Sequence, residues 1–210
     1  MKARTRYGNA SSDNPVPFVL QAVTTAVRRF TAEYLDATRE GMWGDSRSAL
    51  ADLHLGDSRR VLDVGAGTGE LTAVLREETD GEVVAVDADA GLLAHAPPPR
   101  VAGDATRLPF GDDGVDLVVC QALLVNLPDP VEAIREFARV ARERVAVIEP
   151  DNAAVTVDST VDSESELAER ARRLYVDAAA TDPAVGDASD LFAAAGIEQT
   201  TVRRYDHERN

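Results

Sequence analysis

The stretch Val61-Leu62-Asp63-Val64-Gly65-Ala66-Gly67-Thr68-Gly69-Glu70-Leu71 decides the fold of this 210-residue chain. Its first four residues form a short apolar run with one carboxylate, which is typical of a strand buried on both faces of a parallel sheet. Three glycines at alternate positions follow, and glycine lets a backbone turn sharply and approach a ligand closely. Helical spacing begins at Glu70. The stretch therefore predicts a strand, a tight turn and a helix whose free N–H groups lie beside the turn.

Strands and helices alternate on both sides of this stretch. Later strands are predicted at 82–86, 100–102, 115–119, 144–148 and 197–205. Helices are predicted at 18–39, 45–53, 70–78, 89–96, 131–142, 163–180 and 187–195, with Asp129-Pro130 opening the one at 131–142 and Gly196 ending the last. Alternation of this kind implies crossover connections. It predicts an α/β fold, a doubly wound Rossmann-like three-layer sandwich with a mostly parallel sheet.

The domain organisation follows from where the first strand begins. Residues 1–55 precede it and are predicted to form an N-terminal helical segment or lid, and 56–210 the sheet domain. The chain has one domain's worth of residues. The glycine stretch resembles that of a family whose sheet has seven strands, and a seventh strand after 197–205 is doubtful here because few residues remain.

The glycine spacing bears on the ligand, which in such sheets lies beyond the carboxyl ends of the strands, where the strand order reverses. A dinucleotide loop has the pattern G-x-G-x-x-G, which would place its third glycine at position 70. Position 70 is glutamate, whose carboxylate would repel a pyrophosphate. The pattern here, G-x-G-x-G, favours a ligand without phosphates.

Residues 62–69 resemble the first motif of the class I S-adenosylmethionine-dependent methyltransferases, and the resemblance extends from Arg59 to Pro150. It implies S-adenosylmethionine as the cofactor and no metal. Asp87, after the second strand, resembles the acid that binds both ribose hydroxyls. Asp104 resembles the acid that meets the adenine amino group, and Gln121 would lie beside the methionine portion. The implied cofactor-binding residues are Asp63, Gly65, Ala66, Gly67, Gly69, Asp87, Ala88, Asp104, Ala105 and Gln121.

Each of the three aspartates also has a structural interpretation. Asp63 would hold the ammonium end of the cofactor, or it would order the glycine loop by accepting that loop's own N–H groups. Asp87 suits a vicinal diol because one carboxylate accepts two hydrogen bonds, but it could instead cap a helix at 89–96. Asp104 could be a turn residue.

The resemblance fixes no catalytic residue. Methyl transfer is an in-line displacement in which the protein mainly aligns the reactants and excludes water. A general base is needed only when the acceptor starts protonated. Polar residues predicted near the strand ends are Asn126, Glu149, Asp151 and Asn152, for which loop polarity is the simpler interpretation. Trp43 either packs in the core or lines the acceptor pocket.

Composition limits the partners. There are 37 acidic and 22 basic residues, giving a formal net charge of -15. An acidic surface repels phosphate backbones, which argues against nucleic acid. All basic residues except Lys2 are arginines, and the composition resembles that of proteins from halophilic archaea, whose surface charges are screened within about 3 Å in molar salt. On this second interpretation the acidity is an adaptation to salt and says nothing about partners.

We predict no targeting signal that would direct the protein out of the cytoplasm. Cys120 is its only cysteine and lies in an apolar run, so we expect a buried thiol rather than a disulfide or a nucleophile. We see neither an apolar run long enough to cross a membrane nor the apolar stretch of a signal peptide. We expect a cytoplasmic protein.

Three functions remain. The first is an enzyme that methylates a small molecule, since no basic groove or added recognition domain is evident. The second is an S-adenosylmethionine-binding protein with little or no transferase activity that acts with a partner. The third, a nicotinamide-dependent oxidoreductase on the related fold, is disfavoured by Glu70.

Overall fold

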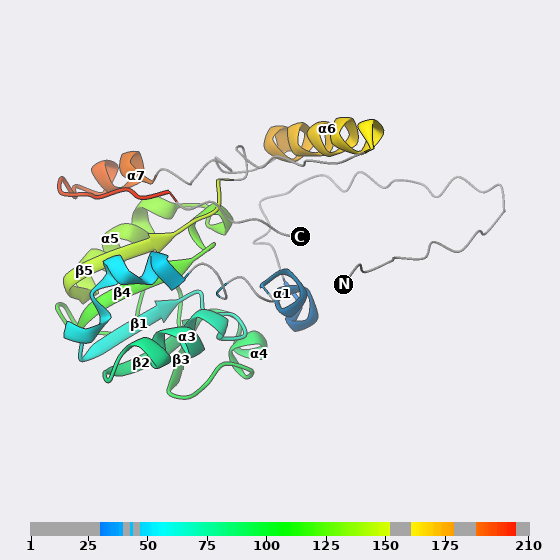
Figure 1. Cartoon of the computed structure of the whole chain (residues 1–210). Helices are drawn as coiled ribbons and strands as arrows, with labels where there is room; N and C mark the ends of the chain where they lie inside the picture. Colours follow the sequence, from blue (N-terminus) through cyan, green and yellow to red (C-terminus); the bar gives the residue numbers. More distant parts are fainter. Residues whose placement is uncertain (1–29, 40–42, 44–46, 152–160, 179–187, 205–210) are drawn as a thin grey trace.

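A computed structural model describes residues 30–39, 43, 47–151, 161–178 and 188–204. Within these ranges one five-stranded sheet has the order β3-β2-β1-β4-β5, and every neighbouring pair is parallel (Figure 1). The strands are β1 (Arg60–Val64), β2 (Glu82–Asp87), β3 (Arg100–Ala102), β4 (Val115–Gln121) and β5 (Ala141–Ile148). The predicted doubly wound α/β fold is confirmed.

The helices fall where the periodicity predicts them, with small changes in length. They are α1 (Ala32–Arg39), α3 (Glu70–Glu78), α4 (Ala90–Leu93), α5 (Pro130–Val140), α6 (Asp162–Ala178) and α7 (Ser189–Ala194). Short 3-10 helices are η1 (Arg47–Leu53), η2 (Leu55–Asp57) and η3 (Leu124–Asn126). The predicted helix at 89–96 is shorter because Asp89 caps it and its last turn loosens into 3-10-type bonds from His95 and Ala96. The predicted helices at 18–39 and 45–53 lie partly outside the described residues.

The two faces of the sheet carry different layers. One face packs Val61, Val83 and Leu117 against α3 and η1. The other packs the alternate residues, such as Leu62 and Val118, against α5 and α7. This alternation produces the predicted three layers, because successive strand residues point to opposite faces.

Helix α5 shows how one such layer forms. Asp129 caps it by accepting from the Glu132 N–H at 3.0 Å, and Pro130 is its first residue, as predicted. Ile134 and Phe137 are fully buried on its sheet-facing side. Burial of such side chains contributes roughly 1.5–3 kcal/mol each.

The predicted sixth strand is wrong over the part that the structure describes. Residues 197–204 have no strand structure. Ile197 instead completes the end of α7, because its N–H donates to the Phe192 carbonyl at 2.9 Å across Gly196, whose φ is 88°. That glycine ends the helix as predicted. The alternation of Ile197, Gln199 and Thr201 that predicts this strand is a local signal, whereas a strand also needs a partner to receive its N–H groups.

We predict that Asp116→Ala lowers the free energy of unfolding by about 3 kcal/mol, because a buried hydrogen-bonded carboxylate is lost and its donors remain. Asp116 accepts from the N–H groups of Arg59 at 2.8 Å and Arg60 at 3.0 Å, and pairs with Arg142 at 2.8 Å. Chemical denaturation at fixed salt measures the change. Asp112→Ala is the matched control, because that carboxylate is exposed and pairs only on the surface with Arg139. Equal losses in the two variants would contradict the prediction.

No helix within the described ranges combines the length and the apolar composition that crossing a bilayer requires.

Candidate functional site

The carboxyl ends of the strands lie level along one edge of the sheet. In the strand registers Val64 pairs with Val86 and with Cys120, Asp87 with Ala102, and Gln121 with Ile148. The chain runs outward from β1 through β2 to β3 and then returns to place β4 on the other side of β1. The strand order therefore reverses between β1 and β4, where ligands bind in open α/β sheets.

The glycine loop after β1 is tightly folded against β2. The N–H groups of Gly65 and Ala66 both donate to the Val86 carbonyl, at 2.8 and 3.0 Å. Gly65, Gly67 and Gly69 have φ values of 75°, 56° and 88°, in the left-handed region that side chains disfavour. The loop therefore needs glycine at these positions for its conformation, and at Gly65 and Gly69 also for space.

We predict that Gly69→Ala destabilises the fold by about 2 kcal/mol or more. A Cβ at this position would lie 2.7 Å from the Ala96 Cα and 2.6 Å from the Pro97 Cδ, and its φ is positive. Thermal unfolding measures the loss. Gly111→Ala is the control, because a Cβ there meets nothing within 4 Å. A variant as stable as the control would show that the loop relaxes freely.

Asp63 lies beneath the loop and is 1% exposed. Its Oδ2 accepts from the Thr72 hydroxyl at 2.5 Å, which links the end of β1 to the first turn of α3. This contact fixes the start of α3. The two roles predicted for Asp63, at the cofactor's ammonium end and at the loop's own N–H groups, both stay predictions.

Asp87 closes the loop from the end of β2. Its Oδ2 accepts from the Gly67 N–H at 2.7 Å, and its Oδ1 accepts from the Asp89 N–H at 2.7 Å. The alternative role for Asp87 was to cap the helix that follows. Asp89 supplies that cap instead, by accepting from the N–H groups of Gly91 and Leu92. Asp87 is half-buried, so its carboxylate is fixed by the backbone yet reachable from outside.

Asp104 follows β3 and makes the turn contact that its structural interpretation predicts. Its Oδ1 accepts from both the N–H and the hydroxyl of Thr106, at 2.8 Å each. These hydrogen bonds lower the pKa of Asp104, so the exposed carboxylate is charged at neutral pH. Ala105 beside it is buried, whereas Ala88, next to Asp87, is exposed.

The segment after β4 faces the glycine loop from the other side of the switch point. Gln121 ends β4 and is 7% exposed. Two residues later, Leu123 lies against Gly65, whose Cβ, if present, would be 2.8 Å from the Leu123 Cδ1. The loops after β1 and β4 therefore touch.

Glu149, at the end of β5, has a larger role than its sequence position indicates. Its Oε1 accepts from the N–H groups of Leu123 at 2.9 Å and Leu124 at 2.8 Å. Burial raises the pKa of Glu149 to about 7, against the effect of the backbone hydrogen bonds from Leu124, Leu123 and Val125. A carboxylate directly after an apolar strand was the available signal, but its partners are 25 and 26 residues away.

The structure also describes two other polar candidates, Asn126 and Asp151. The Asn126 amide donates to the Ala122 carbonyl at 2.8 Å, within the loop after β4, and Asp151 is half-buried. Asn152 lies outside the described residues. Cys120 is fully buried, as expected, and burial raises the pKa of its thiol, as do the Glu149 and Asp63 carboxylates.

Trp43 packs in the core, which answers the question that the sequence left open. It is 5% exposed and belongs to the cluster with Leu50 and Leu71 on the α3 face of the sheet. Its indole Nε1 is buried without a hydrogen-bond partner among the described residues.

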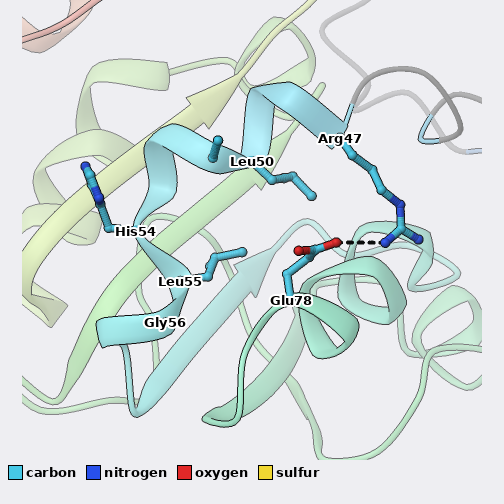
Figure 2. Close-up of a pocket in the computed structure, with 7 residues that line it drawn as sticks. Arg47, Leu50, His54, Leu55, Gly56 and Glu78 are labelled. Carbon is cyan, nitrogen blue, oxygen red and sulfur yellow. Dashed lines mark hydrogen bonds and ion pairs between the residues drawn. The ribbon is translucent and has the colours of Figure 1, made fainter.

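A cavity of about 290 Å³ lies away from the glycine loop. Figure 2 shows Arg47 and Glu78 pointing toward one another across it, joined at 2.7 Å. Glu78 is the last residue of α3, which runs back from the glycine loop toward the amino ends of the strands. The residues that line the cavity are Arg47, Leu50, Ala51, His54, Leu55, Gly56 and Glu78. None of them is a predicted site residue.

Comparison with known proteins points to one family for the part of the chain that forms the sheet. Residues 62–148 match the family described as "Methyltransferase domain". The demethylmenaquinone methyltransferase of Mycobacterium tuberculosis is 42% identical over 99 residues, which are 46% of this chain and 42% of that protein. The corresponding enzyme of Mycolicibacterium paratuberculosis is 43% identical over 116 residues, 51% of this chain and 49% of its own length.

The chain thus spans about half the length of the curated relatives that it matches. Among solved structures, a SAM-dependent methyltransferase from Aquifex aeolicus superposes with a TM-score of 0.54 at 20% identity, covering 71% of this chain and 88% of that one. At this identity the superposition shows a shared fold.

Proposed function

We propose that this protein binds S-adenosylmethionine at the glycine loop and transfers its methyl group to a small molecule. The observation that supports this most directly is the contact between Gly67 and Asp87, which fixes a reachable carboxylate beside the loop. The match of residues 62–148 to a methyltransferase domain agrees with it.

The chemistry of the edge fits this cofactor. Its ribose hydroxyls, adenine amino group and ammonium group are hydrogen-bond donors, and the side chains that end β2 and follow β3, Asp87 and Asp104, are acceptors. Glu70 already places a negative charge on the first turn of α3, which disfavours an anionic ligand there. Asp87 would bind the ribose hydroxyls, Asp104 the adenine amino group, and Gly65, Ala66, Gly67 and Gly69 would pass beneath the cofactor with Ala88 and Ala105 beside it.

The cofactor supplies a sulfonium-activated methyl group. The chain's own residues then have two tasks, to hold the methionine portion in line with the acceptor and to exclude water. Gln121, which ends β4, and Leu123, two residues beyond it, lie on the side of the glycine loop opposite Asp87 and would perform the first. Asp63 acts through Thr72, which keeps the loop in register with α3.

We propose that residues 1–55 form a helical segment of which the part before Trp43 covers this edge as a lid, while η1 packs on the α3 face of the sheet. In Figure 1, α1 lies on the side of the sheet to which the strand arrows point. A lid there would bury the cofactor and supply part of the acceptor pocket, while residues 56–210 form the cofactor domain.

The acceptor class follows from charge and from the relatives. At low salt a net charge of -15 would repel a phosphate backbone, which favours a small-molecule acceptor over a nucleic acid. The curated relatives are named for demethylmenaquinone, so reduced naphthoquinones are the first acceptors to screen. We attribute the acidic, arginine-rich composition to adaptation to a saline cytoplasm, as in halophilic archaea.

Calorimetric titration of the purified protein in molar potassium chloride tests the cofactor assignment. We expect S-adenosylmethionine and its demethylated product to bind with micromolar affinity, about -8 kcal/mol, and NADH not to bind. Binding of NADH alone would reverse the assignment. Binding without product from any acceptor would favour the alternative, a cofactor-binding protein that acts with a partner.

A further inference from the structure

The carboxyl end of β5 reaches across the site through one side chain. Glu149 lies one residue beyond β5, yet its Oε1 accepts from the N–H groups of Leu123 and Leu124, which follow β4. These N–H groups open the 3-10 helix η3, and the first donors of a helix have no partner within it. A carboxylate brought from another strand therefore satisfies them.

The segment held in this way has an unfavourable backbone conformation. Ala122 has a φ of 49°, a left-handed value that costs a non-glycine residue on the order of 1 kcal/mol or more. Its own N–H donates to the Ile148 carbonyl at 2.9 Å. Two successive residues of β5 and its exit, Ile148 and Glu149, thus fix three successive residues after β4. Such a conformation persists only where the surroundings impose it.

What this conformation achieves is the placement of Leu123. The Leu123 side chain packs directly against Gly65: a Cβ on Gly65 would lie only 2.8 Å from the Leu123 Cδ1. Leu123 therefore forms a wall beside the first glycine of the loop, and its position depends on the bond between its N–H and Glu149. The contacts that hold this segment come from the end of β5 and the residue after it.

The second carboxylate oxygen of Glu149 distinguishes this side chain from an ordinary surface cap. Oε2 is buried and accepts no hydrogen bond in the described part of the chain. The Cys120 thiol, 4.0 Å away, contacts Oε1 rather than Oε2. Burying a carboxylate oxygen without a donor costs free energy that a hydrocarbon in its place would not. Stability alone does not account for a glutamate here.

We propose that Glu149 is a positioning residue for the cofactor: its Oε1 holds the residues 122–124 so that Leu123 walls the glycine loop at Gly65. This inference rests on the proposed function for the identity of the ligand. The bond between the carboxylate and the two amides is a separate claim, and it can be measured without any ligand.

Two readouts on the full chain test the proposal, using Glu149→Ala, Glu149→Gln and the control Glu143→Ala. Glu143 lies within β5, the strand that leads to Glu149, but it is exposed and pairs at 3.5 Å with Arg144. The rate of amide hydrogen exchange at Leu123 and Leu124 measures whether Glu149 holds these two N–H groups. Calorimetry with S-adenosylhomocysteine measures the dissociation constant at the proposed cofactor site.

In Glu149→Ala we expect the two amides to exchange at least about tenfold faster and the dissociation constant to rise about 10- to 100-fold, the range usual for supporting contacts around a site. In Glu149→Gln, whose amide oxygen can still accept, both quantities should stay within about threefold of the wild type. The control should change neither.

Unchanged exchange at Leu123 and Leu124 in Glu149→Ala would overturn the proposal. Faster exchange with unchanged affinity would also overturn it, since the held segment would then not matter to the cofactor. If the wild type binds no S-adenosylhomocysteine, the proposed function fails, while the exchange data still decide whether Glu149 holds the segment. If Glu149→Ala does not fold, Glu149→Asp, whose shorter side chain withdraws the acceptor, takes its place.

Discussion

Asp87→Ala is expected to weaken binding of S-adenosylmethionine by about 100-fold or more. In the proposed complex one carboxylate would accept from two ribose hydroxyls, and hydrogen bonds to a charged group contribute roughly 1.5–3 kcal/mol each. The same substitution removes the acceptor of the Gly67 N–H and so loosens the loop itself. Calorimetry in molar potassium chloride measures the change in dissociation constant.

Two further variants separate these contributions. Asp87→Asn keeps one acceptor oxygen, so it should lose about tenfold. Asp89→Ala removes the cap of α4, two residues away, and should lower stability by about 1 kcal/mol with affinity nearly unchanged. If Asp87→Ala binds as tightly as Asp89→Ala, Asp87 does not contact the cofactor.

The second large effect concerns the pH dependence of stability. Burial raises the pKa of Glu149 from about 4.5 to about 7, so the folded protein holds a proton there that the unfolded chain releases. The resulting stabilisation is fully present below pH 4.5 and is lost as the pH rises through 7. Between pH 5 and pH 8 it amounts to about 2 to 3 kcal/mol.

Glu149→Gln is expected to remove this dependence. Its amide is neutral at every pH and mimics the protonated acid, so the variant should equal the wild type near pH 5 and exceed it near pH 8. Denaturation curves of both proteins across this range, at constant salt, give the difference. A constant difference between the two curves would mean that Glu149 is charged throughout, with a pKa near its usual value.

The sequence predicts the sheet well because the signals involved are local. The apolar run at 61–64, the alternate glycines and the Asp129-Pro130 helix start each act within a few residues, and each is confirmed. The strand predicted at 197–205 fails for the opposite reason, since its alternation says nothing about whether another strand stands beside it. Pairing is a property of the tertiary structure.

The candidate site divides in the same way. Asp87 ends β2 and Asp104 lies two residues after β3, so their places along the edge are predictable from the order of elements. The role of Glu149 is not, because the amides it binds belong to a different crossover. The alternative prediction for Asp104, a turn residue, is confirmed, because its carboxylate accepts from the Thr106 N–H.

The return of the chain from β3 to β4 has a consequence for how the protein acquires its site. Asp116, in β4, binds N–H groups 56 and 57 residues earlier, so β1 meets β4 only after a long loop closes. Contacts between residues so far apart in the sequence form slowly, because the chain loses loop-closure entropy before the contact stabilises the fold. A nascent chain that has made β1 to β3 already has its glycine turn, but the facing wall is still missing. A cofactor that binds between the loops after β1 and β4 would therefore meet a complete site only once β4 has paired with β1. Because it would bind the folded state alone, it would stabilise that state against unfolding.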